Sequence, residues 1–510
     1  MMWFMRRWFW NLIAWIKFTL NKPLTIPLPP PAGQLITPVP ISQAIAGLPI
    51  DTILTCAPQQ IPADERSPAK SMVYRLQVWL YAAFSPMQAG LPPIDSDPHT
   101  ALRRAYTRLH RTKFAGPVLP AEFFGSPDLG SLAVRGPYAG YLEKAGDGIF
   151  QWDLSGLAHY DHHPGLRKLG VKVLFRVDPL RRGLQAYEIE TELGMARPDD
   201  ALWELAKKIA LCAVSTHTSL VRHFNWVHLA GGECLGIAIR NRLPATHPLC
   251  RLLWPHTFAT AQNGDMVTRG QMLRGGDFET TFSFSFAGMC RLFEDSYRDF
   301  RMVVNDPEVD ARERQILGHG FDMPTHNNLE ALFKVMHAHA RNYLAIYYQE
   351  SPAAPATAVV RDDAVLMAWL DELNALLPNG VEVTRDNVTF DNLARLIARL
   401  IYMTTVQHEL LGSFMWNYQL WTHRQPVRVA VDGKRESLDV YQRLVNANYN
   451  LNVSRRALMH DFSYLALDDT GRAAMLKFSD ELAAHQAAME RQPWAVWRLY
   501  PSSLKASINA

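Results

Sequence analysis

Long stretches with helical spacing of apolar residues fill the chain after Pro198, and they constrain its fold more than any other feature. Apolar side chains that recur every three to four positions are typical of helices that bury one face. Such faces need neighbouring elements to cover them, so the sequence predicts a large helical body. The stretches are 201–229, 329–349, 364–377, 392–411, 438–447 and 472–491.

A short β element is expected just before this helical body. Residues 171–177 and 184–189 alternate apolar and polar side chains, and Asp178, Pro179 and Gly183 lie between them. This pattern is typical of two strands joined by a turn. The predicted fold class is therefore mainly α, with a small β-hairpin or sheet element near residues 170–190.

Composition excludes several classes of protein. Of the 510 residues, 48% are apolar and 20% charged, which is the balance of a globular chain rather than a disordered chain, a collagen-like fibre or a coiled coil. A net charge of +3 gives no reason to expect a nucleic-acid partner. The cysteines are odd in number and form no C-x-x-C motif, so we expect buried free thiols rather than disulfides or a zinc site. They are Cys56, Cys212, Cys234, Cys250 and Cys290.

The first fifty residues predict two segments that precede a domain over residues 51–510. Residues 1–22 combine aromatic side chains with arginine and lysine, a composition favoured where an amphipathic helix lies in a membrane interface. A signal peptide and a helix that packs on its own domain are the alternatives. The uncharged run 8–16 is too short to cross a bilayer. Residues 23–50 are rich in proline and predict an extended connector.

Histidines concentrate between Trp203 and His256, and two of them have an informative spacing. His223 and His228 are five positions apart. Residues five apart diverge on a regular α-helix, but a local π-type turn, common at functional sites, can bring them to one metal. Neutral imidazole is the commonest ligand for iron, copper and zinc. The pair therefore predicts a metal site, with two structural histidines as the alternative.

The residues around this pair resemble the metal-binding helix of lipoxygenases, the non-haem iron dioxygenases of polyunsaturated fatty acids. An A-x-x-R-x-L element of that family matches only at Ala238 and Leu243, because Asn241 holds the arginine position. The resemblance extends over residues 184–510. The other matching elements, in chain order, are W-x-x-A-K at 203–207, His223-x4-His228, Glu233, His247-Pro248 and L-L-x-P-H at 252–256.

The resemblance implies two further metal ligands. Residues 404–408 resemble the helix that supplies the third histidine, here His408, and residues 507–510 resemble a tail whose terminal carboxylate binds the metal. By position, that carboxylate belongs to Ala510, and an α-carboxyl of any residue is ionised at neutral pH. Three histidines and a carboxylate suit non-haem iron, with manganese as an alternative. The family's small N-terminal β-barrel domain is expected to be absent.

Several positions depart from the family pattern. Gly412 stands where the family usually places an asparagine ligand, and Met415 stands where it often has glutamine. In the stretch that resembles the wall of the substrate channel, Arg274 and Gly275 occupy the position of a small residue, and Phe278 follows. These five residues are the candidates for the substrate channel. An arginine there would either block the deep pocket or pair with a substrate carboxylate.

The resemblance implies an enzyme that inserts O2 into a polyunsaturated fatty acid or related lipid to form a hydroperoxide. The metal centre of the family takes hydrogen from the carbon between two double bonds, and no catalytic side chain beyond the metal site is implied. The departures leave two alternatives: an oxygenase or hydroperoxide isomerase of a specialised metabolite with the same fold, and a non-catalytic lipid-binding homologue. A cytoplasmic location is expected, with membrane contact through residues 1–20; secretion stays open.

Overall fold

The computed structural model describes most of the chain after residue 125. Most of the aromatic N-terminal segment, half of the predicted helix at 438–447 and the proposed ligand Ala510 lie outside the described residues. The described ranges are 25–31, 35–66, 125–348, 356–434, 456–492 and 498–508, with short pieces at 4–5, 8–9, 12, 15, 72, 76, 123, 436–437, 439–441 and 443–444.

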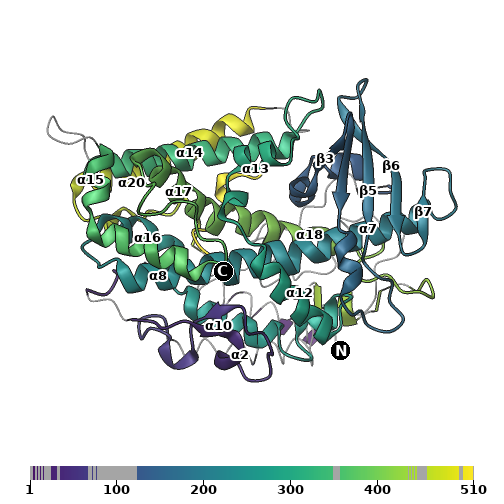
Figure 1. Cartoon of the computed structure of the whole chain (residues 1–510), viewed down its shortest axis with the longest axis horizontal. Coiled ribbons are helices and arrows are strands. Elements are labelled where there is room, and N and C mark those ends of the chain that lie inside the picture. Colours follow the sequence, from purple (N-terminus) through teal and green to yellow (C-terminus); the bar gives the residue numbers. More distant parts are fainter. Residues whose placement is uncertain are drawn as a thin grey trace.

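One long helix runs through the middle of the molecule (Figure 1). It begins as α7 (Trp203–His217), widens into the π-helix η5 (Thr218–Glu233) and returns to α-helical geometry in α8 (Cys234–Arg242). Nearly every side chain of η5 is buried, because other elements pack around the helix on all sides. The predicted helix at 201–229 is therefore confirmed, and the π-type widening that the histidine spacing required is present.

A second long helix contains the third histidine and packs against the first. It starts at α17 (Phe390–Tyr402), where Thr389 and Asn392 form a reciprocal capping box, and continues through the π-helices η7 (Met403–Gln407) and η8 (Leu410–Phe414). It ends as α18 (Met415–Gln419). Contacts of η5 with both η7 and η8 join the two widened segments. The predicted helix at 392–411 is thus confirmed.

The other predicted helices form the layer around this pair. Helix α14 (Pro324–Tyr347) packs on α17 and on α20 (Asp469–Glu490), and α16 (Ala364–Leu376) packs on α8. Figure 1 shows α14 and α20 side by side at one edge of the helical body. The remaining helices are α2 (Ile41–Ala44), α6 (Leu129–Leu132), α9 (Pro248–Thr257), α10 (Thr260–Gln271), α11 (Asp277–Thr281), α12 (Phe286–Arg298), α13 (Pro307–Glu313) and α15 (Ala356–Asp362), with 3-10 turns η1 (Pro58–Gln60), η3 (Gly136–Tyr141), η4 (Ser155–His159), η6 (Met302–Asn305), η9 (Ser463–Leu465) and η10 (Pro501–Ser503).

The β element is larger than the predicted hairpin. The two predicted strands are β5 and β6, and they pair antiparallel in a five-stranded sheet of order β3-β4-β5-β6-β7. Side chains that alternate inward on β4 and β5, such as Trp152 and Phe175 with ring centroids 5.2 Å apart, form the buried face. The strands are β3 (Glu143–Gly146), β4 (Ile149–Asp153), β5 (Lys172–Asp178), β6 (Gly183–Thr191) and β7 (Gly194–Ala196); a second small sheet pairs β1 (Val39–Pro40) with β2 (Leu54–Thr55).

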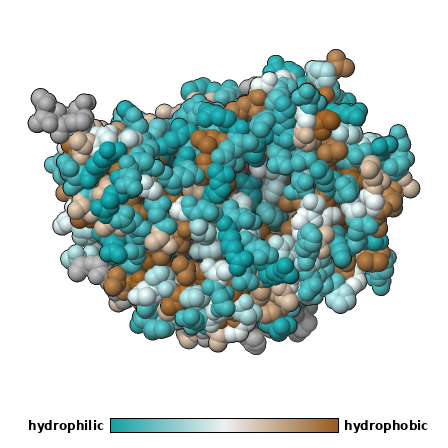
Figure 2. Space-filling model, in the orientation of Figure 1, coloured by the Kyte–Doolittle hydropathy of each residue, from teal (hydrophilic) through white to brown (hydrophobic). Residues whose placement is uncertain are grey.

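The hydrophilic surface and the buried free cysteines match what the composition predicts. Figure 2 shows a face that is mainly hydrophilic, with apolar side chains scattered over it. All five cysteines are buried and free, as expected. Within the described residues, none of the helices combines the length and the apolar character needed to cross a membrane.

Candidate metal centre

The two widened helices bring the three predicted histidines together. One ring nitrogen from each of His223, His228 and His408 lies within 4.8 Å of the others. The ring centroids are 4.7 Å apart for His223 and His228, 5.2 Å for His223 and His408, and 4.9 Å for His228 and His408. All three side chains are buried. Three imidazoles that converge inside a protein form the geometry of a metal-binding site.

The π-helix is the reason that His223 and His228 face the same point. On an α-helix, five residues turn through about 500°, which leaves the first and last side chains about 140° apart. The i→i+5 hydrogen-bond pattern of a π-helix reduces that angle, and the two Nε2 atoms lie 3.2 Å apart. Phe224 stacks on the His228 ring at a centroid distance of 5.6 Å and limits its rotation.

Two histidines of this cluster, His223 and His228, are suited to bind a cation because they are held in the neutral form. Burial lowers the pKa of His223 and of His228 well below 6.5, and the nearby His408 lowers both further. A neutral imidazole keeps a lone pair for a metal. The Nε2 atoms of His223 and His228 are 3.2 Å apart. Two neutral nitrogens with facing lone pairs favour a cation beside them, so the cluster fits a bound metal ion.

A buried ion pair that the sequence analysis missed supports His408. Glu409 lies 3.1 Å from His408 Nδ1 and 3.0 Å from Lys505 Nζ, and Lys505 also donates to Ser413 at 3.0 Å. Burial raises the pKa of Glu409, but the Lys505 charge and the hydrogen bond to His408 outweigh it and hold that pKa at about 2. A carboxylate behind a histidine fixes the ring orientation and raises its basicity.

The C-terminal tail is fixed beside the cluster by several contacts. The Ala506 carbonyl lies 2.7 Å from His256 Nδ1, and the Ile508 carbonyl accepts from Asn263 at 3.3 Å. Ile508 is buried and packs so closely on Gly232 of η5 that a Cβ there would lie 2.2 Å from it. The described part of the tail therefore ends in contact with the helix that carries His223.

Gly412 lies directly against the cluster. A Cβ atom at this position would be 2.5 Å from Nε2 of His223. Any side chain at 412 would therefore have to displace the His223 ring, and glycine leaves that space open. Met415 is fully buried one turn further along, at the start of α18.

The predicted channel residues lie in two different environments. Phe278 is buried and meets Phe224 edge to face at 4.7 Å, so it is one aromatic ring removed from His228. Arg274 and Gly275 instead form an exposed turn between α10 and α11, where the Arg274 guanidinium lies 4.4 Å from the centroid of the Phe286 ring. The structure does not bring these two residues to the histidines, and their role in a channel stays a prediction.

The comparisons with known proteins agree with this fold. Residues 190–450 match the sequence model of the family described as Lipoxygenase. The chain is 22% identical over 316 residues to the polyunsaturated fatty acid lipoxygenase of Bos taurus, covering 57% of this chain and 46% of that protein. It is 20% identical over 238 residues to the manganese lipoxygenase of Pleurotus sapidus, covering 46% and 36%. The chain thus spans less than half of these relatives' length.

The solved structures extend the likeness to the whole fold. A calcium-dependent 11R-lipoxygenase superposes with a TM-score of 0.74 at 18% identity, covering 98% of this chain and 80% of that one. The family match covers residues 190–450, which is about half of the chain, and this range includes His223, His228 and His408. The chain belongs to the lipoxygenase family. The members of that family are oxidoreductases of the dioxygenase type.

Proposed function

We propose that this chain is a metal-dependent dioxygenase of unsaturated fatty acids or related lipids. The observation that carries the proposal is the convergence of three buried imidazoles at the place where two π-widened helices pack together. His223, His228 and His408 would hold the metal, and the main-chain carboxylate of Ala510 would complete the set. Iron is the first expectation, and the likeness to a manganese lipoxygenase keeps manganese as the alternative.

The residues of this chain would contribute positioning rather than acid–base chemistry. A bound iron or manganese ion supplies the redox chemistry for hydrogen abstraction from a lipid. Glu409 and Lys505 orient His408, and Phe224 orients His228. The apolar surroundings of the cluster, including Phe278, suit a hydrocarbon chain and exclude water.

Oxygen consumption tests this proposal. The full chain, expressed with iron or manganese, is expected to consume O2 with linoleate and to form a conjugated hydroperoxide, but to leave stearate unchanged because it has no double bonds. Deletion of residues 509–510 should remove both activity and metal. Metal-loaded, folded protein that consumes no O2 with any unsaturated fatty acid would contradict the proposed reaction.

A second candidate reaction is favoured by Gly412. Its backbone lies against His223, so no side chain at 412 can bind the metal. A site with this difference could isomerise a lipid hydroperoxide instead of forming one. In that case, linoleate would give no O2 uptake, whereas linoleate hydroperoxide would be converted into another product.

Membrane contact through the N-terminal segment belongs to the same proposal. Phe4, Trp8 and Trp15 are helical and more than half exposed, which suits a helix at a lipid surface. A water-insoluble substrate would make such contact useful. Binding of the full chain to anionic vesicles, compared with a chain in which the three residues are serine, tests this; equal binding would contradict it. The cytoplasmic location stays a prediction.

A further inference from the structure

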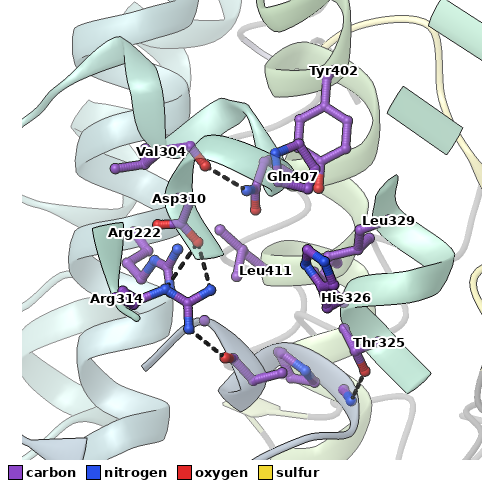
Figure 3. A pocket seen from close by; sticks show the side chains of 16 residues that line it. Arg222, Val304, Asp310, Arg314, Thr325, His326, Leu329, Tyr402, Gln407 and Leu411 are labelled. Atoms are coloured by element: carbon purple, nitrogen blue, oxygen red, sulfur yellow. Dashed lines mark hydrogen bonds and ion pairs between the residues drawn. The ribbon is translucent and has the colours of Figure 1, made fainter. Parts of the chain in front are cut away.

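A cavity with polar and apolar walls lies beside the helices that carry the histidines, and the proposed function does not use it. The cavity encloses about 440 Å³ of space outside the protein atoms, part of it open to solvent. It is formed where η3, α13 and α14 meet the two histidine helices, with Arg222, Tyr402 and Leu411 in its wall (Figure 3). Arg222 directly precedes His223, and Leu411 lies three residues after His408.

Arg222 brings a buried positive charge to this cavity. Its side chain is nine-tenths buried, yet it forms no ion pair in the part of the chain that the structure describes. Its guanidinium lies 5.1 Å from the centroid of the Tyr141 ring, and Gly140 lets the backbone of η3 come close, because a Cβ there would be 2.0 Å from Nη1. A buried guanidinium without a carboxylate is expensive unless an anion can reach it.

The other charged groups of the cavity wall leave this charge uncompensated. Asp310 accepts two hydrogen bonds from Arg314, at 3.0 and 2.6 Å, so its charge is engaged there, as the dashed lines in Figure 3 show. Burial lowers the pKa of His326 below 6.5, which keeps that ring neutral near pH 7. The wall therefore has one positive charge in excess, from Arg222.

Tyr402 provides an independent sign of a missing ligand. Its side chain is fully buried in the cavity wall, and its hydroxyl has no hydrogen-bond partner among the described residues. Burial raises the pKa of this hydroxyl well above 10, the charge of Asp310 raises it further, and the charge of Arg222 lowers it in part. A hydroxyl that stays protonated is a donor, and a buried donor without an acceptor is rarely left so.

We propose that this cavity binds an organic carboxylate, held by the guanidinium of Arg222 and the hydroxyl of Tyr402. A planar guanidinium matches a carboxylate with two parallel hydrogen bonds, and the phenol adds a third donor. The glycines, prolines and leucines of the wall suit the carbon chain next to the carboxylate. The ligand is either the carboxylate end of a fatty acid or a small carboxylic acid. The site requires no metal.

Calorimetric titration of the full chain with dodecanoate tests the inference, since this saturated acid cannot be oxygenated. Dodecanol is the neutral probe of the same length, and butyrate is the small carboxylate. Arg222→Gln removes the charge, and Tyr402→Phe removes the hydroxyl with little change of shape. Arg312→Gln, at an exposed arginine paired with Glu308, is the matched control for loss of one positive charge.

Dodecanoate is expected to bind the unchanged protein and the Arg312 variant equally. Its affinity should fall about tenfold or more with Arg222→Gln, and severalfold with Tyr402→Phe, because hydrogen bonds to a charged group are lost. Dodecanol binding should not respond to either change. Competition by butyrate would identify small carboxylates as ligands; dodecanoate binding without butyrate competition would identify a lipid.

Unchanged dodecanoate affinity in both variants would overturn the inference, as would an equal response of dodecanol. Metal content, measured on the same samples, separates this result from the proposed function. A variant that keeps its metal and loses dodecanoate binding supports the carboxylate site alone. Loss of binding to dodecanoate by the metal-free, folded wild-type chain would also overturn it, because the site requires no metal.

Discussion

Replacing Lys505 with methionine tests how the C-terminal tail is held against the histidine cluster. Lys505 Nζ lies 3.0 Å from Glu409 Oε1, and both side chains are at most 10% exposed. With an effective dielectric constant of about 20, the gross attraction at this distance is about 5.5 kcal/mol. Desolvation offsets part of it, and removal of one partner of a buried pair costs about 3–5 kcal/mol. We expect the Lys505→Met protein to lose about 3 kcal/mol of unfolding free energy.

Urea denaturation of the full chain, followed by tryptophan fluorescence, measures this loss. The double variant Lys505→Met with Glu409→Gln should recover part of it, because no carboxylate is then left buried without its cation. Lys477→Met is the matched control: Lys477 pairs with Glu481 at 3.6 Å and is 61% exposed, so its loss should cost less than about 1 kcal/mol.

The Lys505→Met protein should also bind its metal less tightly, since the pair of Lys505 and Glu409 orients His408 and anchors the tail. A Lys505→Met protein as stable as the Lys477→Met control would refute the reasoning. So would a double variant that is less stable than the wild type by the sum of the two single losses.

Two further substitutions give separate tests. Gly412→Ala places a Cβ 2.5 Å from His223 Nε2, so it should lower the unfolding free energy by about 1–3 kcal/mol in urea denaturation. The control Gly156→Ala, with no atom within 4 Å of its new Cβ, should leave the stability unchanged. Equal stability of the two variants would contradict the close contact. Burial raises the pKa of Glu233 from 4.5 to about 7. The unfolded chain therefore releases this proton first as pH rises, and stability should fall by about 3 kcal/mol between pH 4.5 and 7. Glu233→Gln should abolish that part of the pH dependence in denaturation curves, and an unchanged pH profile would show that Glu233 is not its source.

The long helices, and the place of the π-helix, could be inferred from patterns in the sequence. The apolar spacing of 364–377 and 472–491 reflects helices that bury one face, and these became α16 and α20 with ends shifted by a few residues at most. The five-residue spacing of His223 and His228 allows both to face one metal only on a widened helix, so the spacing indicated where a π-type turn would lie if the pair binds a metal; η5 lies there. Where a single segment sets the geometry, its sequence predicts the structure.

The outer strands of the sheet could not be predicted in the same way. Strands β3 and β7 have four and three residues, too few to show a period of two. Their pairing with β4 and β6 decides that they are strands. Tertiary contacts, rather than local preference, form these edges.

The support of His408 depended on distant parts of the chain. Glu409 and Lys505 are 96 positions apart, and only the folded tail brings them together. A weak signal existed, since Lys505 is the single charged side chain within residues 499–510. Its partner could not be identified from the sequence. The cavity at Arg222 and Tyr402 also depends on tertiary contacts, because elements from five separate segments of the chain form it.

The most direct test of the metal centre is the metal content of the purified full chain. Inductively coupled plasma mass spectrometry of the wild type should find about one iron or manganese ion per chain, and His408→Gln should lose most of it, because loss of a ligand weakens a four-ligand site. Circular dichroism would establish that both proteins are folded. A folded wild type that takes up neither metal when both are supplied, or a His408→Gln protein that binds metal as the wild type does, would contradict the proposed centre.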